Sequence, residues 1–568
     1  MVGKGMKVFA TLMFLGGCLQ LSGCAGIQKI AQQPDPHAPQ DVVSSKGMVA
    51  AAHPLASAAG LEILKKGGNA IDAAIATGLA IGVVEPNASG LAGTGFMVIH
   101  TKDGEDVAID FRGMAPAFIT PDYKKKYLSK GMPGRSNASS VLVPGVVAGY
   151  EEAHKRYGKL PMTEIVKPAI RLAEEGFPCS QALSKLINDN YDWFLTNNAE
   201  EDVPFLNDGL PVMEGEIIKQ PKLAKAFRLI AEKGAYDAFY NGPIGESMVK
   251  RLNELGNKMT MDDMRSYRAA MREPVKGSYR GYQVVSMPPT STGGLTAIET
   301  LNILENYPLS MWEHNSTNHL HHLMEATRIA FTDRNKFLAD PDFTEIPHDM
   351  LLSKKYAKQR AEEISPALAR DKFEPGVIDD EHWSTTHLSV ADAEGNIVAL
   401  TQTIVLFFGA KTFDPEYGFC YNDELISFSS SSTSSNAAAQ GKRPRSSMTP
   451  TMVLDQEGNA FMTLGSPGSS RIINALVQII SNVIDFGMSM DEAIEAARMA
   501  GTNKNKIYLE GHIPNVETKS QILSVMGYRT EVRGPYNLYF GGAQGIMFKD
   551  GKLLGGADSR RDGIALGY

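Results

Sequence analysis

The spacing of apolar residues mixes helical and strand-like segments from Met48 onward, and regular alternation becomes more frequent after residue 384. In the first part Asn69 predicts a helix start, because an asparagine side chain there can accept hydrogen bonds from the first free backbone N–H groups. The elements expected before residue 384 are helices at 55–66, 69–78, in much of 146–260 and at 293–340, with strands at 97–100, 107–111 and 282–286.

Two hairpins are predicted after residue 384, and helices and further strands follow them. The first hairpin pairs 386–392 with 397–403 around the turn at 394–396, and the second pairs 452–454 with 460–464. Strands followed by helices and again by strands predict an α+β fold, a four-layer αββα sandwich. The other elements expected are helices at 470–486 and 489–500 and strands at 506–509, 529–533, 545–548 and 553–555.

Composition and charge narrow the class of protein. The chain has 568 residues, 43% of them hydrophobic and 21% charged, which permits a large core and argues against general disorder or a polytopic membrane protein. The formal net charge of −8 leaves no basic excess to neutralise phosphates, so no nucleic-acid partner is expected. The spacing of Cys179 and Cys420 does not require a disulfide between them.

The N-terminus has the pattern of an export signal. Two lysines precede an apolar run at 8–21, which is shorter than the roughly 20 residues that span a bilayer. Leu21-Ser22-Gly23-Cys24 resembles the lipobox of bacterial lipoproteins, which implies cleavage after residue 23, lipidation of Cys24 and a tether over 24–45. The alternative is an ordinary signal peptide cut nearby. Either leads to the bacterial periplasm or cell surface, the lipidated form being held on a membrane.

Two sequence features suggest ligands but have simpler explanations. The glycine-rich segment 90–95 lacks the order of a nucleotide-binding loop and is better explained as a tight turn. His319, His321 and His322 lie near Glu325 without an H-E-x-x-H motif, so a cluster in the core or on the surface is favoured over a metal site. No metal and no cofactor are expected.

Thr385-Thr386-His387 by itself indicates only β-propensity, but the motifs around it change that interpretation. Along nearly its whole length, the mature chain resembles the γ-glutamyltransferase family of N-terminal-nucleophile hydrolases. The order and spacing of the motifs carry this resemblance. They are Asp110-Phe111-Arg112-Gly113-Met114-Ala115-Pro116, the segments 143–149, 279–282 and 287–289, Thr385-Thr386-His387, the segment 442–451, Gly465-Ser466-Pro467-Gly468-Ser469-Ser470-Arg471 and Gly556-Ala557-Asp558-Ser559-Arg560.

The resemblance implies a precursor that cleaves itself between Ser384 and Thr385. A large subunit over 46–384, preceded by the tether, and a small subunit over 385–568 would then associate as a heterodimer. Once Thr385 is N-terminal, its α-amine, with an ordinary pKa of about 7.7–8.0, can act as general base for its own hydroxyl. The implied reaction transfers a γ-glutamyl group from glutathione or a similar donor, through a Thr385 ester, to water, an amino acid or a peptide.

The resemblance also implies roles for other residues of the proposed site. Thr403 matches a threonine that supports the nucleophile, and the backbone N–H groups of Gly468 and Ser469 match an oxyanion hole. The residues matched to binding of the donor's α-carboxylate are Arg112, Ser446 and Ser447. The family usually has glycine at the position of Ser469, but a backbone donor survives that change.

The proposed binding site for the donor's ammonium group departs from the family pattern. Val405 stands where the family has Asn or Glu, and Ser427 stands where it has Asp. Replacing a carboxylate by a hydroxyl loses a charge-assisted hydrogen bond of about 1.5–3 kcal/mol, part of which Glu424, at a Gln or Glu position, could recover. Only a short Ser- and Ala-rich segment joins Phe428 to Lys442, so the long lid loop of some members is absent.

Three hypotheses remain open on the sequence. The first is an exported γ-glutamyl hydrolase and transferase. The second is an amidase of the same fold with another acyl group, such as a glutaryl-type acylase or a poly-γ-glutamate-processing enzyme. The third is a non-catalytic surface lipoprotein that keeps the fold for binding or scaffolding.

Overall fold

The computed structural model describes residues 37, 40–128, 137–371, 383–502 and 504–568. The segment from Pro39 to Tyr568 forms one compact unit. The predicted signal over 1–23, Cys24 and most of the predicted tether lie outside the described residues. No helix in the described part of the chain combines the length and hydropathy needed to cross a bilayer.

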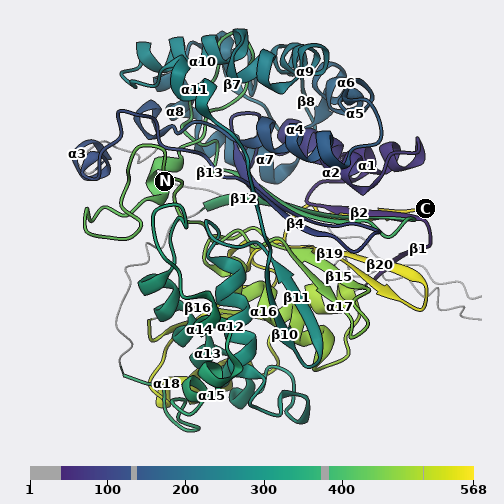
Figure 1. Ribbon diagram of the computed structural model, residues 1–568, viewed down its shortest axis with the longest axis vertical. Coiled ribbons are helices and arrows are strands. Elements are labelled where there is room, and N and C mark those ends of the chain that lie inside the picture. Colours follow the sequence, from purple (N-terminus) through teal and green to yellow (C-terminus); the bar gives the residue numbers. More distant parts are fainter. Residues whose placement is uncertain (1–36, 38–39, 129–136, 372–382, 503) are drawn as a thin grey trace, which may run out of the picture. The chain divides into compact units, whose positions relative to one another are not determined.

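Two seven-stranded antiparallel sheets lie face to face in the middle of this unit (Figure 1). The first has the order β21(Ile564–Gly567), β2(Gly47–Ala51), β12(Trp383–Asp392), β13(Ile397–Leu406), β3(Thr94–His100), β4(Asp106–Phe111) and β9(Ala270–Arg272). The second has the order β1(Val42–Ser44), β20(Lys552–Ala557), β19(Gln544–Lys549), β15(Ala460–Gly465), β14(Thr451–Leu454), β11(Tyr282–Ser286) and β10(Val275–Tyr279).

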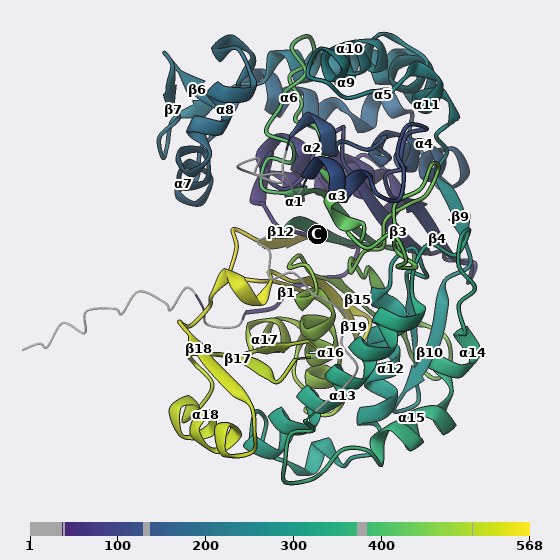
Figure 2. The same ribbon diagram turned by 90° about the vertical axis from the view of Figure 1, so that its left-hand side faces the viewer.

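Helices cover the outer face of each sheet, so the described unit has four layers (Figures 1 and 2). Over the first sheet lie α1(Pro54–Lys65), α2(Ala70–Val84), α4(Val146–Tyr157), α5(Met162–Ile165), α6(Lys167–Glu175), α9(Pro221–Lys233), α10(Pro243–Glu254) and α11(Met261–Ser266). Over the second lie α12(Gly293–Leu304), α13(Thr317–Phe337), α14(His348–Leu352), α15(Lys354–Ala361), α16(Arg471–Ile484) and α17(Met490–Glu495). This arrangement confirms the predicted αββα fold.

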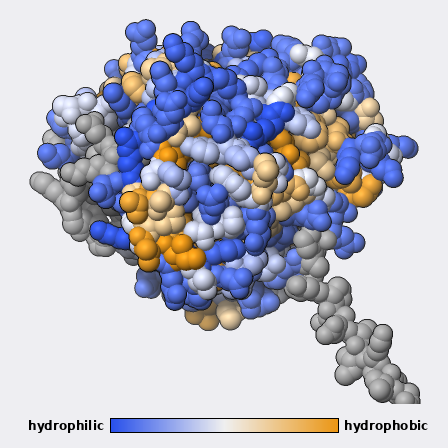
Figure 3. Space-filling view, turned by 90° about the horizontal axis from the view of Figure 1, so that it is seen from below, coloured by the Kyte–Doolittle hydropathy of each residue, from blue (hydrophilic) through white to orange (hydrophobic). Residues whose placement is uncertain are grey.

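Smaller elements lie at the margins of the four layers. They are α3(Tyr123–Leu128), α7(Gln181–Asp189), α8(Tyr191–Asn197), α18(Val516–Val525), the pairs β5(Phe177–Pro178) with β8(Ile217–Ile218) and β6(Leu206–Asn207) with β7(Leu210–Pro211), and the sheet β16(Met499–Gly501)-β17(Lys506–Glu510)-β18(Arg529–Arg533). The molecular face in Figure 3 is mostly hydrophilic, with small separate hydrophobic patches.

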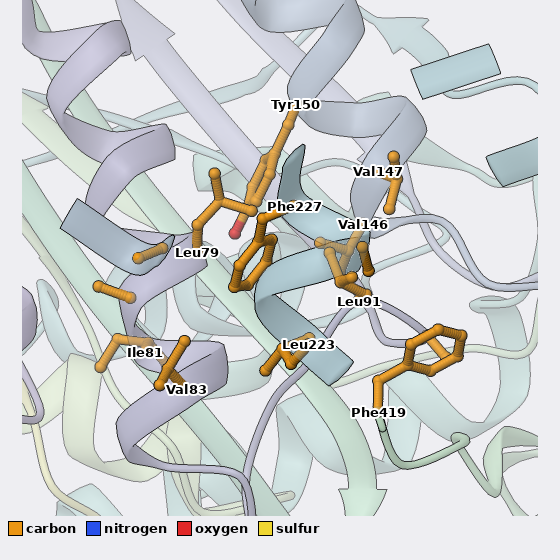
Figure 4. Close-up of a cluster of buried hydrophobic side chains, with 14 of the residues drawn as sticks. Leu79, Ile81, Val83, Leu91, Val146, Val147, Tyr150, Leu223, Phe227 and Phe419 are labelled. Carbon is orange, nitrogen blue, oxygen red and sulfur yellow. The ribbon is translucent and has the colours of Figure 1, made fainter. Parts of the chain in front are cut away.

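Two large apolar clusters hold the layers together. One lies between the first sheet and its helices, where Phe227 of α9 packs between Leu79 of α2 and Val146 of α4 (Figure 4). The other fills the space between the two sheets and beneath the helices of the second. Because close-packed interiors tolerate little displacement, these clusters fix the strands that carry the site described below.

Each sheet contains strands from both sides of position 384. In the first sheet β12 and β13 lie between β2 and β3, and in the second β14 pairs with β11. A cut at position 384 would therefore leave two chains joined by strand pairing and by both apolar clusters. This topology explains how two pieces of one chain can remain a single folded unit.

Most of the predicted elements are confirmed, and one is partly wrong. Asn69 accepts from the N–H groups of Ile71 and Asp72 in a capping box, and α2 continues beyond the predicted end to Val84. The helix expected at 489–500 ends at Glu495, and Met499–Gly501 instead forms β16 against β17. Tertiary pairing there overrides the local helical pattern.

Cys179 and Cys420 are both buried free thiols. The three histidines of α13 are buried as well: His319 Nδ1 accepts from Asn315 N at 3.0 Å, and His321 Nε2 lies 2.6 Å from the carbonyl oxygen of Ser365. These contacts agree with the interpretation of this cluster as part of the core.

Asp558, in the last of the sequence motifs, is the centre of a buried charge network. Its carboxylate lies 2.8 Å from Arg498 Nη2 and 2.9 Å from Arg560 Nη1, and it accepts from the N–H of Ala543. Although burial alone raises the pKa of Asp558, the two guanidinium groups lower it to about 2. The ionised carboxylate therefore stabilises the fold.

Asp558→Asn should lower the free energy of unfolding by about 3–5 kcal/mol, because it leaves Arg498 buried without its ion-pair partner, while Arg560 keeps its contact with Glu510. A carboxylate with a lowered pKa stabilises above its unfolded pKa of about 3.8. The difference between wild type and variant should therefore hold above pH 4 and shrink as pH falls toward 2. Denaturant unfolding at several pH values measures it, with Asp550→Asn in the exposed turn after β19 as the control. Equal stability of Asp558→Asn and wild type at pH 7 would contradict the network's role.

Candidate active site

Thr385 lies near the start of the central strand β12, where the pairing with β13 changes register between Ser384 and Thr386. Its side chain is almost fully buried, and its Oγ1 donates to Thr403 Oγ1 at 3.4 Å. Thr403 Oγ1 in turn accepts from the N–H of Val405 at 2.8 Å. β-Bulges commonly redirect a side chain next to a functional site, and this one places two threonine hydroxyls together.

The backbone at Val405 is strained. Its φ of 87° lies in the left-handed region, which a β-branched residue rarely adopts. Such outliers cost about 1–3 kcal/mol and persist only where the surroundings impose them. The strain accompanies the register shift opposite Thr385, and Val405 lines the same pocket as Thr385.

A residue near the C-terminus also contacts the main chain at Thr385. Arg561 Nη1 donates to the carbonyl oxygen of Thr385 at 2.9 Å. Arg561 lies 3.9 Å from Glu85, whose carboxylate accepts from Thr386 Oγ1 at 2.8 Å. Three parts of the chain distant in sequence thus fix the backbone around this threonine.

Thr385 opens into a pocket of about 660 Å³. The structure brings most of the predicted site residues to its wall: Thr385, Thr403, Arg112, Ser427, Ser446, Ser447 and Ser469. Gly468 directly precedes Ser469, and Glu424 lies against Arg112. Residues from both sides of position 384 therefore form one cavity.

Arg112 follows the end of β4 and is buried beneath the pocket. Its Nε donates to the carbonyl oxygen of Pro444 at 3.1 Å and lies 2.6 Å from Glu424 Oε1, and its Nη2 donates to Ser427 Oγ at 3.2 Å. Burial lowers the pKa of Arg112, but a guanidinium stays charged in proteins. Arg112 is thus a fixed cation in the pocket wall.

Glu424 occupies a fully buried position in the short 3-10 helix Glu424–Ser427. Burial raises the pKa of Glu424 to about 7, although the charge of Arg112 opposes this shift. Glu424 Oε1 contacts Nε of Arg112, whereas Nη2 of the same guanidinium donates to Ser427 Oγ on the pocket wall. Nη2 of Arg112 therefore lies on the pocket side of this pair, where it can donate to an anionic ligand.

Ser446 and Ser447 belong to an extended segment held against the residues that precede α12. The N–H of Ser446 donates to the carbonyl oxygen of Thr290, and Thr292 Oγ1 donates to the carbonyl oxygen of Ser446. Ser447 Oγ accepts from Arg334 Nη2 at 2.8 Å. Both hydroxyls are thereby presented on the same wall as Arg112.

Gly468 and Ser469 form the turn between β15 and α16. Both have positive φ, 131° and 59° respectively. No acceptor for either N–H group lies within the described part of the chain. Because both precede the N-terminus of α16, these donors lie in a region of positive potential that favours an oxyanion.

The motifs in the sequence did not indicate several basic residues of the pocket: Lys124, Lys125, Arg334 and Arg445. Arg445 lies within the family motif at 442–451 and directly precedes Ser446, so this motif could have indicated that Arg445 is near the site. Arg334 lies within the helix predicted at 293–340, and nothing in the local pattern indicates that it reaches the pocket. Among the described residues, no group of three or more His, Cys, Asp or Glu side chains has the arrangement of a metal site.

The family model for gamma-glutamyltranspeptidase matches residues 56–568. Among curated proteins, the Glutathione hydrolase proenzyme of Escherichia coli K12 is 35% identical over 589 residues, covering 99% of this chain and 99% of that protein. The Acylase ACY 1 proenzyme of Pseudomonas sp. strain SE83 is 39% identical, covering 91% of this chain and 93% of that protein.

Among solved structures, the cephalosporin acylase from Bacillus halodurans superposes with a TM-score of 0.86. It is 31% identical in sequence, and the match covers 95% of this chain and 98% of the other. The similarity therefore extends over both halves of the four-layer fold.

Proposed function

Because the chain belongs to the gamma-glutamyltranspeptidase family, we propose that it hydrolyses and transfers γ-glutamyl groups with Thr385 as its self-generated nucleophile. The enzyme is of the N-terminal-nucleophile type and works as two subunits processed from a proenzyme. The observation that carries the assignment to Thr385 is its position: a buried threonine, bonded to Thr403, on the wall of the pocket that contains Arg112.

Cleavage of the precursor requires only groups that adjoin the Ser384–Thr385 bond. The Thr385 hydroxyl attacks the carbonyl carbon of Ser384, the C–N bond breaks, and the nitrogen takes the hydroxyl proton. Water then hydrolyses the resulting ester, which frees the carboxylate of Ser384 and restores the Thr385 hydroxyl. The products include the α-amine that the later reaction needs as its base, so the uncut chain should be inactive.

In the processed enzyme the α-amine takes the proton of the Thr385 hydroxyl as its oxygen attacks the γ-carbonyl carbon of the donor. The N–H groups of Gly468 and Ser469 stabilise the negative oxygen of the tetrahedral intermediate. The amine of the leaving group accepts a proton as the C–N bond breaks, and a γ-glutamyl ester of Thr385 remains. Water, an amino acid or a peptide then attacks the ester and releases the threonine.

Arg112, Ser446 and Ser447 are proposed to bind the α-carboxylate of the donor. A guanidinium can contact both oxygens of a carboxylate, and two hydroxyls on the same wall add neutral donors. The position of Arg112 Nη2 beside Ser427 on the pocket wall supports this role. Glutathione and related γ-glutamyl amides carry the α-carboxylate that this arrangement fits.

A second candidate is an acylase with a different acyl group. It is favoured by the absence of an acidic side chain among the described residues that line the pocket, where Val405 and Ser427 stand instead. The similarity to Acylase ACY 1 points the same way. A donor whose acyl group lacks the ammonium needs no acidic partner in the pocket, so the absence of one would not weaken its binding.

Comparing a γ-glutamyl anilide with the corresponding glutaryl anilide tests the two candidates. The proposed function predicts a higher kcat/KM for the γ-glutamyl compound, by about 10-fold or more if the ammonium gains even one charge-assisted hydrogen bond. Ser427→Asp, which adds a carboxylate beside Arg112, should increase that preference further. Equal or better turnover of the glutaryl compound by the wild type would favour the acylase.

Export and lipid anchoring complete the proposal. The predicted signal over 1–23 and the lipobox ending at Cys24 support attachment of the enzyme to a bacterial membrane facing the periplasm or the exterior. In cells, Cys24→Ala should release the protein from the membrane fraction. Equal membrane association of this variant and the wild type would contradict lipidation at Cys24.

A further inference from the structure

The pocket beside Thr385 carries more positive charge than the proposed donor site uses. Its described lining contains five basic residues and no acidic one: Arg112, Lys124, Lys125, Arg334 and Arg445. Lys124 Nζ donates to the carbonyl oxygens of Ile426 and Phe428. Arg112 lies against the buried carboxylate of Glu424.

Arg334 and Arg445 form a pair of like charges in the wall. The side chain of Arg334 donates to Thr292 Oγ1 at 2.7 Å and to Ser447 Oγ at 2.8 Å, both neutral acceptors. Burial and the nearby charge of Arg445 both lower the pKa of Arg334. Burial also lowers the pKa of Arg445. Two guanidinium groups close together without a counter-charge are costly, and an anion between them would relieve that cost.

The main chain holds Arg445 next to the proposed donor site. Its N–H donates to Asn436 Oδ1 at 3.0 Å, and the preceding residue, Pro444, accepts from Arg112 Nε. The following residue is Ser446. The guanidinium of Arg445 makes no hydrogen bond or ion pair with any described residue, and it faces a cavity of about 660 Å³. Cavities of this size accept ligands much larger than a γ-glutamyl group.

We propose that Arg445, assisted by Arg334, binds a second carboxylate of the substrate, carried by the amine that leaves the γ-carbonyl or by the amine that attacks the ester. This inference rests on the proposed γ-glutamyl activity and deepens it, because it identifies the amine partner as an acidic amino acid, peptide or arylamine. Arg112 with Ser446 and Ser447 takes the first carboxylate, and the Arg334–Arg445 pair takes the second.

Two matched anilides test the leaving-group side. The donors are γ-glutamyl-4-nitroanilide, whose leaving amine is neutral, and γ-glutamyl-3-carboxy-4-nitroanilide, whose leaving amine carries a carboxylate. The quantity measured is the ratio of kcat/KM for the carboxylated donor to that for the neutral donor. A general loss of activity in a variant cancels from this ratio.

The wild type should prefer the carboxylated donor, and Arg445→Leu should reduce the ratio by about 10- to 100-fold, the effect of one or two charge-assisted hydrogen bonds. Arg445→Lys should keep part of the preference, because it retains the charge without the planar fork. Arg529→Leu removes an equal charge from an exposed position on β18 and should not change the ratio.

The acceptor side is tested by transfer from the neutral anilide to Gly-Asp and to its uncharged counterpart Gly-Asn. Dependence of either preference on Arg445 supports the inference and identifies the source of the carboxylate. Ratios that are the same in wild type and Arg445→Leu, for both donors and both acceptors, would overturn it. If the wild type turned over neither γ-glutamyl anilide, the proposed function itself would fail, which is a different result.

Discussion

Thr385→Ala should remain a single uncut chain and should lose hydrolysis and transfer of γ-glutamyl groups. The substitution removes the atom that attacks the Ser384 carbonyl, and without cleavage no α-amine is available as a base. Removing the nucleophile from such a unit typically lowers kcat by about 10⁴- to 10⁶-fold. Denaturing electrophoresis and an anilide assay on the same preparation measure both effects.

Two variants control for this substitution. Thr385→Ser keeps a hydroxyl and should still cleave and turn over substrate, at lower rates. Thr386→Ala changes the adjacent threonine, whose hydroxyl bonds to Glu85 and does not line the pocket, and it should still cleave. A cut at position 384 in Thr385→Ala would show that another group performs the cleavage.

Arg112→Ala should still yield two subunits but should lower kcat/KM for a γ-glutamyl anilide by about 10²- to 10³-fold. Two charge-assisted hydrogen bonds to the donor's carboxylate, at about 1.5–3 kcal/mol each, account for a loss of that size. Arg112→Lys should be intermediate, because an ammonium lacks the bidentate geometry.

The Arg112→Ala experiment needs a matched control, because Arg112 forms an ion pair with Glu424. Arg112→Ala leaves Glu424 buried without its cation, so part of any loss could come from lower stability. The double variant Arg112→Gln/Glu424→Gln removes both charges and should recover stability without recovering activity. An Arg112→Ala enzyme with wild-type kcat/KM would exclude Arg112 from donor binding.

Local chemistry explains why so much of the fold was predictable. Asn69 caps α2 as its position suggested, and the alternating residues on either side of 394–396 form the β12–β13 hairpin. The secondary structure of the segment 489–500 was harder to predict, because Met499–Gly501 becomes a strand only through its pairing with β17. The helical spacing of 489–500 did not indicate that its last residues would leave the helix and pair with this nearby strand.

The site shows the same division between local and long-range information. Family motifs located the residues around Thr385, Arg112 and Ser446, which the structure places on one pocket wall. The bond between Arg334 and Ser447 joins residues that are 113 positions apart, and neither segment alone predicts it. The strain at Val405 depends on a register shift against β12 and was equally inaccessible to sequence patterns.

Mass spectrometry of the processed enzyme, mixed with a γ-glutamyl donor and stopped in acid, tests the central claim most directly. The small subunit should begin Thr385-Thr386-His387-Leu388, and the γ-glutamyl mass should be on the peptide that starts with Thr385. A small subunit that begins at another residue, or an acyl group found on another side chain, would contradict the assignment of Thr385 as the self-generated nucleophile.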